Sequence, residues 1–376
     1  MKPFILEPVY CRLEGPDLQL RKPAKSIISL VLAMLALEGL VRATDEDRRI
    51  IGDPFKDEVG MMQFLVPDPY FQWRGRAGMR LITENEYLNS RGFRAPDHAR
   101  EKRPGVIRVA VLGDSCSFGI VASGPMRLET PRPYAGLLQD LFDRNMGSGR
   151  VEVLNYALIG YTSFHGLRVL KREALPDNPD FVVIRFGWND HLASLTHRSY
   201  SNPRSLWIER LEDLYFKSRL LTLLSWRGMP MEYTRKHKIP WAVSANPVVW
   251  VRPDDYAWNL SRMIDIARAH GATPILIDAP AAPVTPEIKG GKVFIAGTGY
   301  VTLDQLLQAH ARYRAITDRV AREKGVLLVR TDAPPAESAR YFSRYDIAHP
   351  MAEGHLRIAR RLYTAMVESI IRQEAR

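Results

Sequence analysis

The stretch Ile107–Gly119, IRVAVLGDSCSFG, decides how the chain folds. Its first half is a Val-rich apolar run with little alternation, which is typical of a strand that is buried on both faces of a parallel sheet. Gly113-Asp114-Ser115 then predicts a turn from strand to helix, with a hydroxyl at the carboxyl end of the strand. Open α/β sheets bind their ligands at this edge. A serine in such a turn more often only caps a helix, so Ser115 as a nucleophile is a hypothesis that the rest of the chain must support.

The same pattern of apolar runs and amphipathic stretches continues to the C-terminus. We expect five strands, at Ile107–Gly113, Val151–Leu154, Phe181–Phe186, Thr273–Ile277 and Gly325–Val329. We expect the main helices at Arg132–Arg144, Phe164–Glu173, Asp254–His270, Gln305–Lys324 and Gly354–Gln373. Strands that alternate with helices indicate a mostly parallel sheet with helices on both faces, which is a three-layer α/β/α domain. Right-handed crossovers place the carboxyl ends of all the strands at one edge.

The composition excludes several classes of protein. The chain has 376 residues, of which 46% are hydrophobic and 25% charged, as in an ordinary globular protein. A net charge of +11 and a pI of about 9.6 are values that nucleic-acid-binding proteins show. The basic residues are nevertheless spread along the chain, so we predict no nucleic-acid partner. We expect these residues either to lie on solvated helix faces or to give the protein an affinity for anionic lipid or an acidic polymer. Two cysteines, without CxxC or HExxH spacing, predict no disulfide framework, no metal site and no cofactor.

The N-terminal region differs from the rest of the chain. Residues 1–25 form a polar, basic tail, and Ser26–Val41, SIISLVLAMLALEGLV, is apolar apart from its serines and Glu38. Its 16 residues are fewer than the roughly 20 that span a bilayer. A signal anchor, a cleaved signal peptide and an amphipathic helix packed on the domain are therefore all open. The basic lead-in and the lack of a clear cleavage site favour a transmembrane signal anchor over residues 26–42, with the domain in the periplasm or outside the cell.

Two further segments surround the predicted α/β domain, which spans residues 105–376. Residues 43–104 are polar with scattered aromatic side chains, and we interpret them as a connecting arm that packs on the domain. Residues 191–253 interrupt the alternation between the third and fourth strands and contain a predicted helix at Leu206–Trp226. An insert of this length beside the active edge predicts a lid or substrate-binding element, with a structural cap as the alternative.

Four polar segments follow strands at the predicted active edge. They are Gly113-Asp114-Ser115, the stretch Asn155–Ser163 around Gly160, Gly187-Trp188-Asn189-Asp190, and Asp346-Ile347-Ala348-His349. Each segment has an ordinary structural explanation, as a turn or a helix cap. Together, in this order along one edge, they indicate a single site.

The residue types in these segments match the needs of acyl transfer. A serine hydroxyl is a weak nucleophile until an imidazole takes its proton, and the imidazole needs a carboxylate that holds its tautomer. Asp346 and His349 are three residues apart, so one turn brings the carboxylate beside the ring. The tetrahedral intermediate needs donors for its oxyanion, which the backbone N–H groups of Ser115 and Gly160 and the amide of Asn189 can supply.

The four segments together resemble the sequence blocks of the SGNH hydrolase superfamily, the GDSL-like esterases and lipases. Ser115 matches the nucleophile, Gly160 and Asn189 match the second- and third-block residues, and Asp346 and His349 match the DxxH pair. The resemblance covers roughly residues 106–373 and implies a flavodoxin-like, five-stranded parallel sheet. It also extends to bacterial members with one N-terminal membrane anchor. The chain departs from the family pattern at Cys116-Ser117, where leucine is common after the first block, and at Trp188, where a small residue is frequent.

The resemblance implies a serine esterase that hydrolyses an acyl ester, either a carbohydrate O-acetyl group or a lipid ester, through an acyl-enzyme on Ser115. Two alternatives stay open. The same residues serve an O-acyltransferase that acts on a cell-envelope glycan, and a degenerate site would leave a non-catalytic component of an envelope assembly. The substrate partner is expected to be an acyl ester of a glycan or a lipid.

Overall fold

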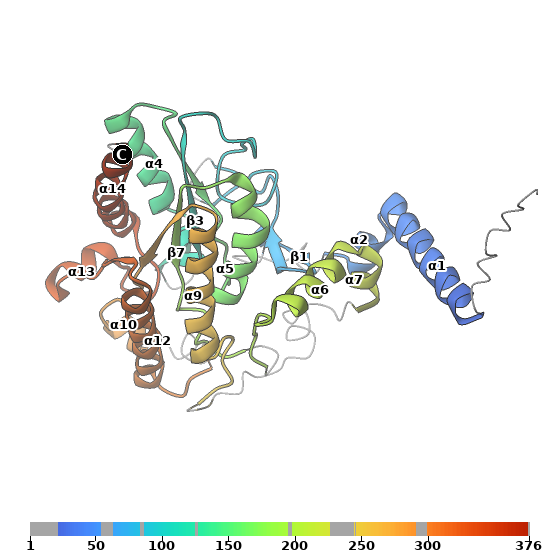
Figure 1. Ribbon diagram of the computed structural model, residues 1–376. Helices are drawn as coiled ribbons and strands as arrows, with labels where there is room; N and C mark the ends of the chain where they lie inside the picture. Colours follow the sequence, from blue (N-terminus) through green and yellow to red (C-terminus); the bar gives the residue numbers. More distant parts are fainter. Residues whose placement is uncertain are drawn as a thin grey trace, which may run out of the picture.

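The computed structural model describes residues 22–53, 63–82, 86–124, 127–194, 198–225, 244, 246–290 and 299–374. A five-stranded parallel sheet lies at its centre (Figure 1). In spatial order the strands are β6 (Val151–Asn155), β3 (Ile107–Gly113), β7 (Phe181–Arg185), β8 (Thr273–Ile277) and β9 (Leu327–Val329). In chain order this is 2-1-3-4-5, the arrangement of a flavodoxin-like sheet. The predicted fold class is confirmed.

Alternate residues of the central strand face two different helical layers. Val109 and Val111 of β3 pack in one apolar cluster with α4 (Tyr134–Met146) and α14 (Ala352–Glu374). Ala110 and Leu112 belong to a second cluster on the other face. This second face is covered by α5 (Ser163–Val169), α9 (Pro253–Ala269) and α12 (Leu303–Lys324). Both faces of the sheet are therefore buried, which explains why its strands are apolar runs with little alternation.

The arm before the domain forms part of the second cluster. It contains α2 (Glu46–Ile51) and an antiparallel hairpin of β1 (Leu65–Asp68) and β2 (Gln72–Gly75). Its aromatic side chains Phe64, Trp73 and Phe93 are buried in the same core as the sheet. The scattered aromatic residues of the arm thus serve to attach it to the domain.

The described part of the insert contains two helices where the sequence predicts one. The prediction of one helix around Leu206–Trp226 is wrong, because α6 (Leu206–Lys217) ends at Lys217 and α7 (Arg219–Ser225) begins at Arg219. Trp226 lies outside the described residues. Ser218 has an extended backbone, with φ −87° and ψ 115°. The break is stabilised by Glu38 of α1 (Lys22–Thr44), whose carboxylate accepts hydrogen bonds from the N–H groups of Arg219 and Leu220.

Candidate active site

Ser115 lies at the turn that the sequence predicts, between β3 and the short helix α3 (Ser115–Phe118). Asp114 caps this helix, since its side chain accepts a hydrogen bond of 2.9 Å from the N–H of Cys116. A capping carboxylate of this kind stabilises the first turn of a helix. Ser115 itself is only 7% exposed, so it is recessed from the protein surface.

The structure brings Ser115, His349 and Asp346 together in one hydrogen-bonded chain. The Oγ atom of Ser115 lies 2.8 Å from Nε2 of His349. On the other side of the ring, Nδ1 lies 2.9 Å and 3.0 Å from the two carboxylate oxygens of Asp346. With the proton on Nδ1, directed at the carboxylate, Nε2 is free to accept the hydrogen bond from the serine hydroxyl.

The electrostatics of the pair favour this proton arrangement. Burial by itself disfavours the charged imidazole, but the charge and hydrogen bond of Asp346 outweigh burial and raise the pKa of His349 above its usual value. Burial likewise acts to raise the pKa of Asp346, but the neighbouring His349 and several backbone N–H groups outweigh it and lower that pKa. Asp346 is therefore held as an anion beside an imidazole that binds a proton readily.

A β-hairpin that the sequence does not predict supports the carboxylate. β4 (Val121–Gly124) and β5 (Arg127–Glu129) follow directly after the Ser115 turn. The N–H of Ala122 in β4 donates to Oδ2 of Asp346 at 3.0 Å, and the N–H groups of Ala348 and His349 donate to Oδ1 at 3.0 Å each. Three backbone donors thus fix the orientation of Asp346. No motif signals the contribution of Ala122, because a backbone donor can belong to any residue.

Gly160 and Asn189 lie at the same edge of the sheet. Gly160 has φ +79°, a conformation that glycine adopts far more readily than other residues. A Cβ atom there would lie 3.1 Å from the ring of Trp73. The ring nitrogen of Trp73 donates to the carbonyl of Ile159 at 3.0 Å, so the arm fixes the loop that carries Gly160.

The three predicted oxyanion donors differ in whether they are already paired. The side-chain amide of Asn189 donates to the carbonyl of Tyr161 at 2.9 Å, which links the two loops. Within the part of the chain that the structure describes, no acceptor takes the N–H of Ser115 or of Gly160. Unpaired N–H groups beside a nucleophile are suited to an oxyanion.

Arg185 is a second feature that the sequence analysis missed. It is the last residue of the buried strand β7, and its guanidinium lies 3.6 Å from the carboxylate of Asp114 under the serine turn. Both side chains are about 1% exposed. A charged residue in an otherwise apolar strand could have indicated this pair from the sequence, since buried arginine is rare unless it is paired with an opposite charge. The pair balances charge below the site and does not touch the Ser115 hydroxyl in this structure.

The thiol of Cys116, next to Ser115 in the chain, is not placed for chemistry of its own. Cys116 is fully buried, its thiol contacts the carbonyl of Ala348 at 3.4 Å, and burial raises the pKa of the thiol. It is therefore inert as a nucleophile. Among the described residues, no group of three His, Cys, Asp or Glu side chains is placed to hold a metal ion.

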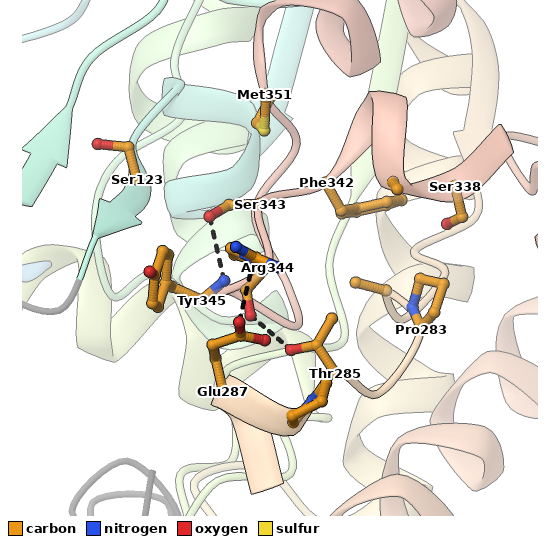
Figure 2. Close-up of a pocket in the computed structure, with 13 residues that line it drawn as sticks. Ser123, Pro283, Thr285, Glu287, Ser338, Phe342, Ser343, Arg344, Tyr345 and Met351 are labelled. Atoms are coloured by element: carbon orange, nitrogen blue, oxygen red, sulfur yellow. Dashed lines mark hydrogen bonds and ion pairs between the residues drawn. The ribbon is translucent and has the colours of Figure 1, made fainter. Parts of the chain in front are cut away.

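A cavity of about 510 Å³ lies beside the loop that carries Asp346 and His349 (Figure 2). One side is polar, where Arg344 pairs with Glu287 at 3.1 Å and its carbonyl accepts from the hydroxyl of Thr285 at 2.6 Å. Figure 2 shows Phe342 and Pro283 on another side. The lining also includes Ser123 of β4, Ala282, Ser338, Ala339, Ser343, Tyr345 and Met351. The residues on both sides of the Asp346–His349 loop, Phe342–Tyr345 and Met351, thus contribute to the cavity.

The fold and the hydrogen-bonded Ser–His–Asp arrangement define the class of α/β/α hydrolases with a serine at the edge of a parallel sheet. The family model for GDSL-like lipases and acylhydrolases matches residues 111–357, so the chain belongs to that family and is a hydrolase that acts on ester bonds. This confirms the resemblance inferred from the sequence blocks. A comparison with curated protein sequences finds no match.

Several solved structures are similar to this chain. An acetylxylan esterase from Geobacillus stearothermophilus is 17% identical, with a TM-score of 0.41 and coverage of 68% of this chain and 92% of the other. A lipase/acylhydrolase from Enterococcus faecalis is 17% identical, with a TM-score of 0.41 and coverage of 69% and 95%. LAE5, a hydrolase from the metagenome of Lake Arreo in Spain, is 16% identical, with a TM-score of 0.42 and coverage of 69% and 94%.

Proposed function

We propose that this protein is a serine esterase that cleaves an acyl ester through an acyl-enzyme on Ser115. The observation that carries the proposal is the continuous hydrogen-bonded chain from Oγ of Ser115 through His349 to Asp346. Transfer of the serine proton to an imidazole that a carboxylate orients turns a weak hydroxyl into a nucleophile. The raised pKa of His349 suits a group that must take up the serine proton.

In the first half-reaction, Nε2 of His349 accepts the proton of Ser115 while Oγ forms a bond to the carbonyl carbon of the ester. Asp346 stabilises the imidazolium that results. The oxyanion is held by the N–H groups of Ser115 and Gly160 and by the amide of Asn189. The imidazolium then protonates the leaving alcohol as the C–O bond breaks. In the second half-reaction, His349 deprotonates water as the water oxygen bonds to the acyl carbon. The imidazolium then returns this proton to Oγ of Ser115 as the acyl C–Oγ bond breaks, which releases the acid and restores the enzyme.

The cavity beside the loop of Asp346 and His349 is our proposed binding site for the part of the substrate beyond the ester. Its polar side, with Arg344, Glu287 and Thr285, suits hydroxyl groups, and its apolar side, with Phe342 and Pro283, suits a hydrocarbon or sugar face. We propose an O-acylated glycan or a lipid-linked ester as the substrate class, because both present this combination of polar and apolar surface.

We also propose that α1 is a retained membrane anchor, with the domain in the periplasm or outside the cell. The helix is long and apolar enough to cross a membrane over Ser26–Thr44, and its apolar side chains are mostly exposed. Glu38 and Arg42 tie its C-terminal end to the insert by hydrogen bonds to Arg219 and Lys217. A segment that is integrated in this way argues against removal as a signal peptide.

The proposal is tested with the Ser115→Ala variant of the full chain. We expect loss of short-acyl-ester hydrolysis to the level of the uncatalysed reaction and loss of labelling by a fluorophosphonate, with an unchanged circular dichroism spectrum. Ser90→Ala, in the arm, is the matched control and should keep both activities. Full activity in Ser115→Ala refutes the proposal. A labelled acyl donor separates hydrolysis, which releases free acid, from transfer, which leaves the label on an added glycan.

A further inference from the structure

Helix α6 is oriented against the usual rule for a helix at a protein surface. Its acidic side chains face the domain, where Glu209 contacts Lys171 at 2.8 Å and Asp213 contacts Arg172 at 3.1 Å. Glu212 and Arg168 form a third ion pair on the same side. In a soluble protein the side of an amphipathic helix that faces the domain is normally the apolar one.

The apolar side chains of α6 point away from the domain. Trp207, Leu211 and Leu214, at helical spacings of four and three residues, are 64%, 54% and 62% exposed. Leu206 and Ile208 of the same helix are also exposed. A contiguous stripe of large apolar residues on an outer surface marks an interaction site.

The position of α6 relative to α1 indicates what this stripe meets. Glu38 of α1 accepts hydrogen bonds from the hydroxyl of Ser218 at 2.8 Å and the N–H of Arg219 at 2.9 Å, at the junction of α6 and α7. Arg42, one turn further along α1, donates to the carbonyl of Lys217 at the end of α6. Figure 1 shows α6 and α7 between α1 and the α/β body, running across the direction of α1.

The depth of this junction corresponds to the membrane interface. Glu38 precedes the end of α1 at Thr44 by six residues, or about 9 Å along the helix axis. An interfacial helix buries its apolar face about 5–10 Å into the headgroup and acyl boundary. The contacts of Glu38 therefore hold the junction of α6 and α7 about 9 Å before the end of α1, within the depth that the apolar face of an interfacial helix reaches.

We propose that α6 lies in the surface of the membrane that α1 crosses, with Trp207, Leu211 and Leu214 inserted among the lipid acyl chains. This inference rests on the proposed role of α1 as an anchor. The exposed residues Arg210 and Lys217 lie on the same helix and meet the phosphates of anionic headgroups. Tryptophan at the stripe is typical of a membrane–water interface. The insert is thus a second membrane contact that fixes the height and tilt of the active edge above the lipid surface.

The test places an environment-sensitive NBD fluorophore on the full chain in lipid nanodiscs. Leu211→Cys is made in a Cys11→Ser background; the remaining native thiol, Cys116, is buried and does not label. Nanodiscs with doxyl-labelled phosphatidylcholine should quench the NBD emission clearly relative to unlabelled nanodiscs, because the label lies at the depth of the headgroup and acyl boundary. Ile371→Cys on α14, also at an exposed apolar residue, is the matched control and should show no lipid quenching.

A third site separates this inference from the anchor itself. Leu32→Cys in α1 should be quenched strongly by deep doxyl groups. If the label at residue 32 is not quenched, the anchor proposal fails. If residue 32 is quenched and residue 211 behaves like residue 371, the anchor stands and the proposal for α6 is overturned. A blue-shifted but unquenched label at residue 211 also overturns it, in favour of a protein surface, such as a second copy of this chain, against α6.

Discussion

The substitution Asp346→Asn tests the proposed mechanism most directly, because the environment of each carboxylate oxygen is defined. Oδ1 accepts the N–H groups of Ala348 and His349, and Oδ2 accepts the N–H of Ala122. An asparagine satisfies the larger number of donors by placing its oxygen at the Oδ1 position. Its NH₂ group then replaces Oδ2 and faces both the N–H of Ala122 and Nδ1 of His349.

This arrangement reverses the tautomer of the imidazole. The NH₂ group donates to Nδ1 of His349, so the ring proton moves to Nε2 and points at Ser115, which can no longer give up its proton to that nitrogen. Loss of the correct tautomer in a Ser-His-Asp site lowers kcat by about 10⁴-fold. This corresponds to about 5 kcal/mol of lost transition-state stabilisation.

The pH dependence supplies an independent readout. In the native protein His349 must be neutral to act as a base, and Asp346 raises its pKa, so activity should fall as the pH drops through a value above 6.5. Asp346→Asn removes the negative charge that raises the pKa of His349, while burial still disfavours the imidazolium. The acidic limb of the residual activity should therefore move to lower pH. The raised pKa of His349 stabilises the fold at pH values below the ordinary histidine pKa, and this contribution is lost as the pH rises through the raised pKa. Asp346→Asn should remove it, because the carboxylate is what raises the pKa.

The assay is the pH profile of kcat for a chromogenic acetyl ester, measured between pH 4.5 and pH 9, with thermal melting as the check of folding. Asp304→Asn, at an exposed position in α12, is the control and should match the native profile. If Asp346→Asn keeps activity within about tenfold of the native protein and an unmoved acidic limb, the role assigned to Asp346 is wrong.

Three further substitutions test the surroundings of the site. Gly160→Ala should lower kcat by about 10²-fold or more, because a residue with a Cβ is strained at φ +79° and this atom would press on the ring of Trp73 at 3.1 Å and shift the loop. Gly271→Ala, with φ +77° and open space around it, should cost stability alone, and equal kcat values in the two variants would contradict the assignment. Trp73→Phe removes the 3.0 Å hydrogen bond to the carbonyl of Ile159, in the loop of Gly160. In steady-state kinetics it should lower kcat more than it changes KM. An unchanged kcat would mean that the arm does not position the loop. Ala339→Trp partly fills the proposed substrate cavity and should raise KM for a large glycan or lipid ester while acetyl-ester hydrolysis stays constant; no difference between the two substrates places binding elsewhere.

The elements that the sequence predicts correctly depend on local information. The apolar runs of the central strands stand out because those strands are buried on both faces, so few polar residues interrupt the pattern, as Arg185 does at the end of β7. The Gly-Asp-Ser turn and the Asp346–His349 spacing are also local, since cap and one-turn geometry are set by neighbouring residues. Right-handed crossovers then bring these distant segments to one edge without any knowledge of side-chain contacts.

The features that escaped prediction all depend on contacts between distant parts of the chain. The N–H of Ala122 supports Asp346 across 224 residues, and Trp73 holds the loop of Gly160 across 86 residues. The break at Ser218 arises from Glu38, 180 residues earlier. None of these partners carries a distinctive sequence pattern.

By itself, then, the sequence determined the layers of the fold and the identity of the Ser115, His349 and Asp346 set, because hydrophobic period, turn chemistry and crossover handedness act over short stretches. Only the tertiary structure decided which backbone donors orient Asp346, which cavity lies between the segments on either side of the Asp346–His349 loop, and which face of α6 is turned outward. The physical reason is that burial and hydrogen-bond satisfaction are properties of the packed chain, so a helix with an apolar stripe has the same sequence whether that stripe faces a core or a membrane.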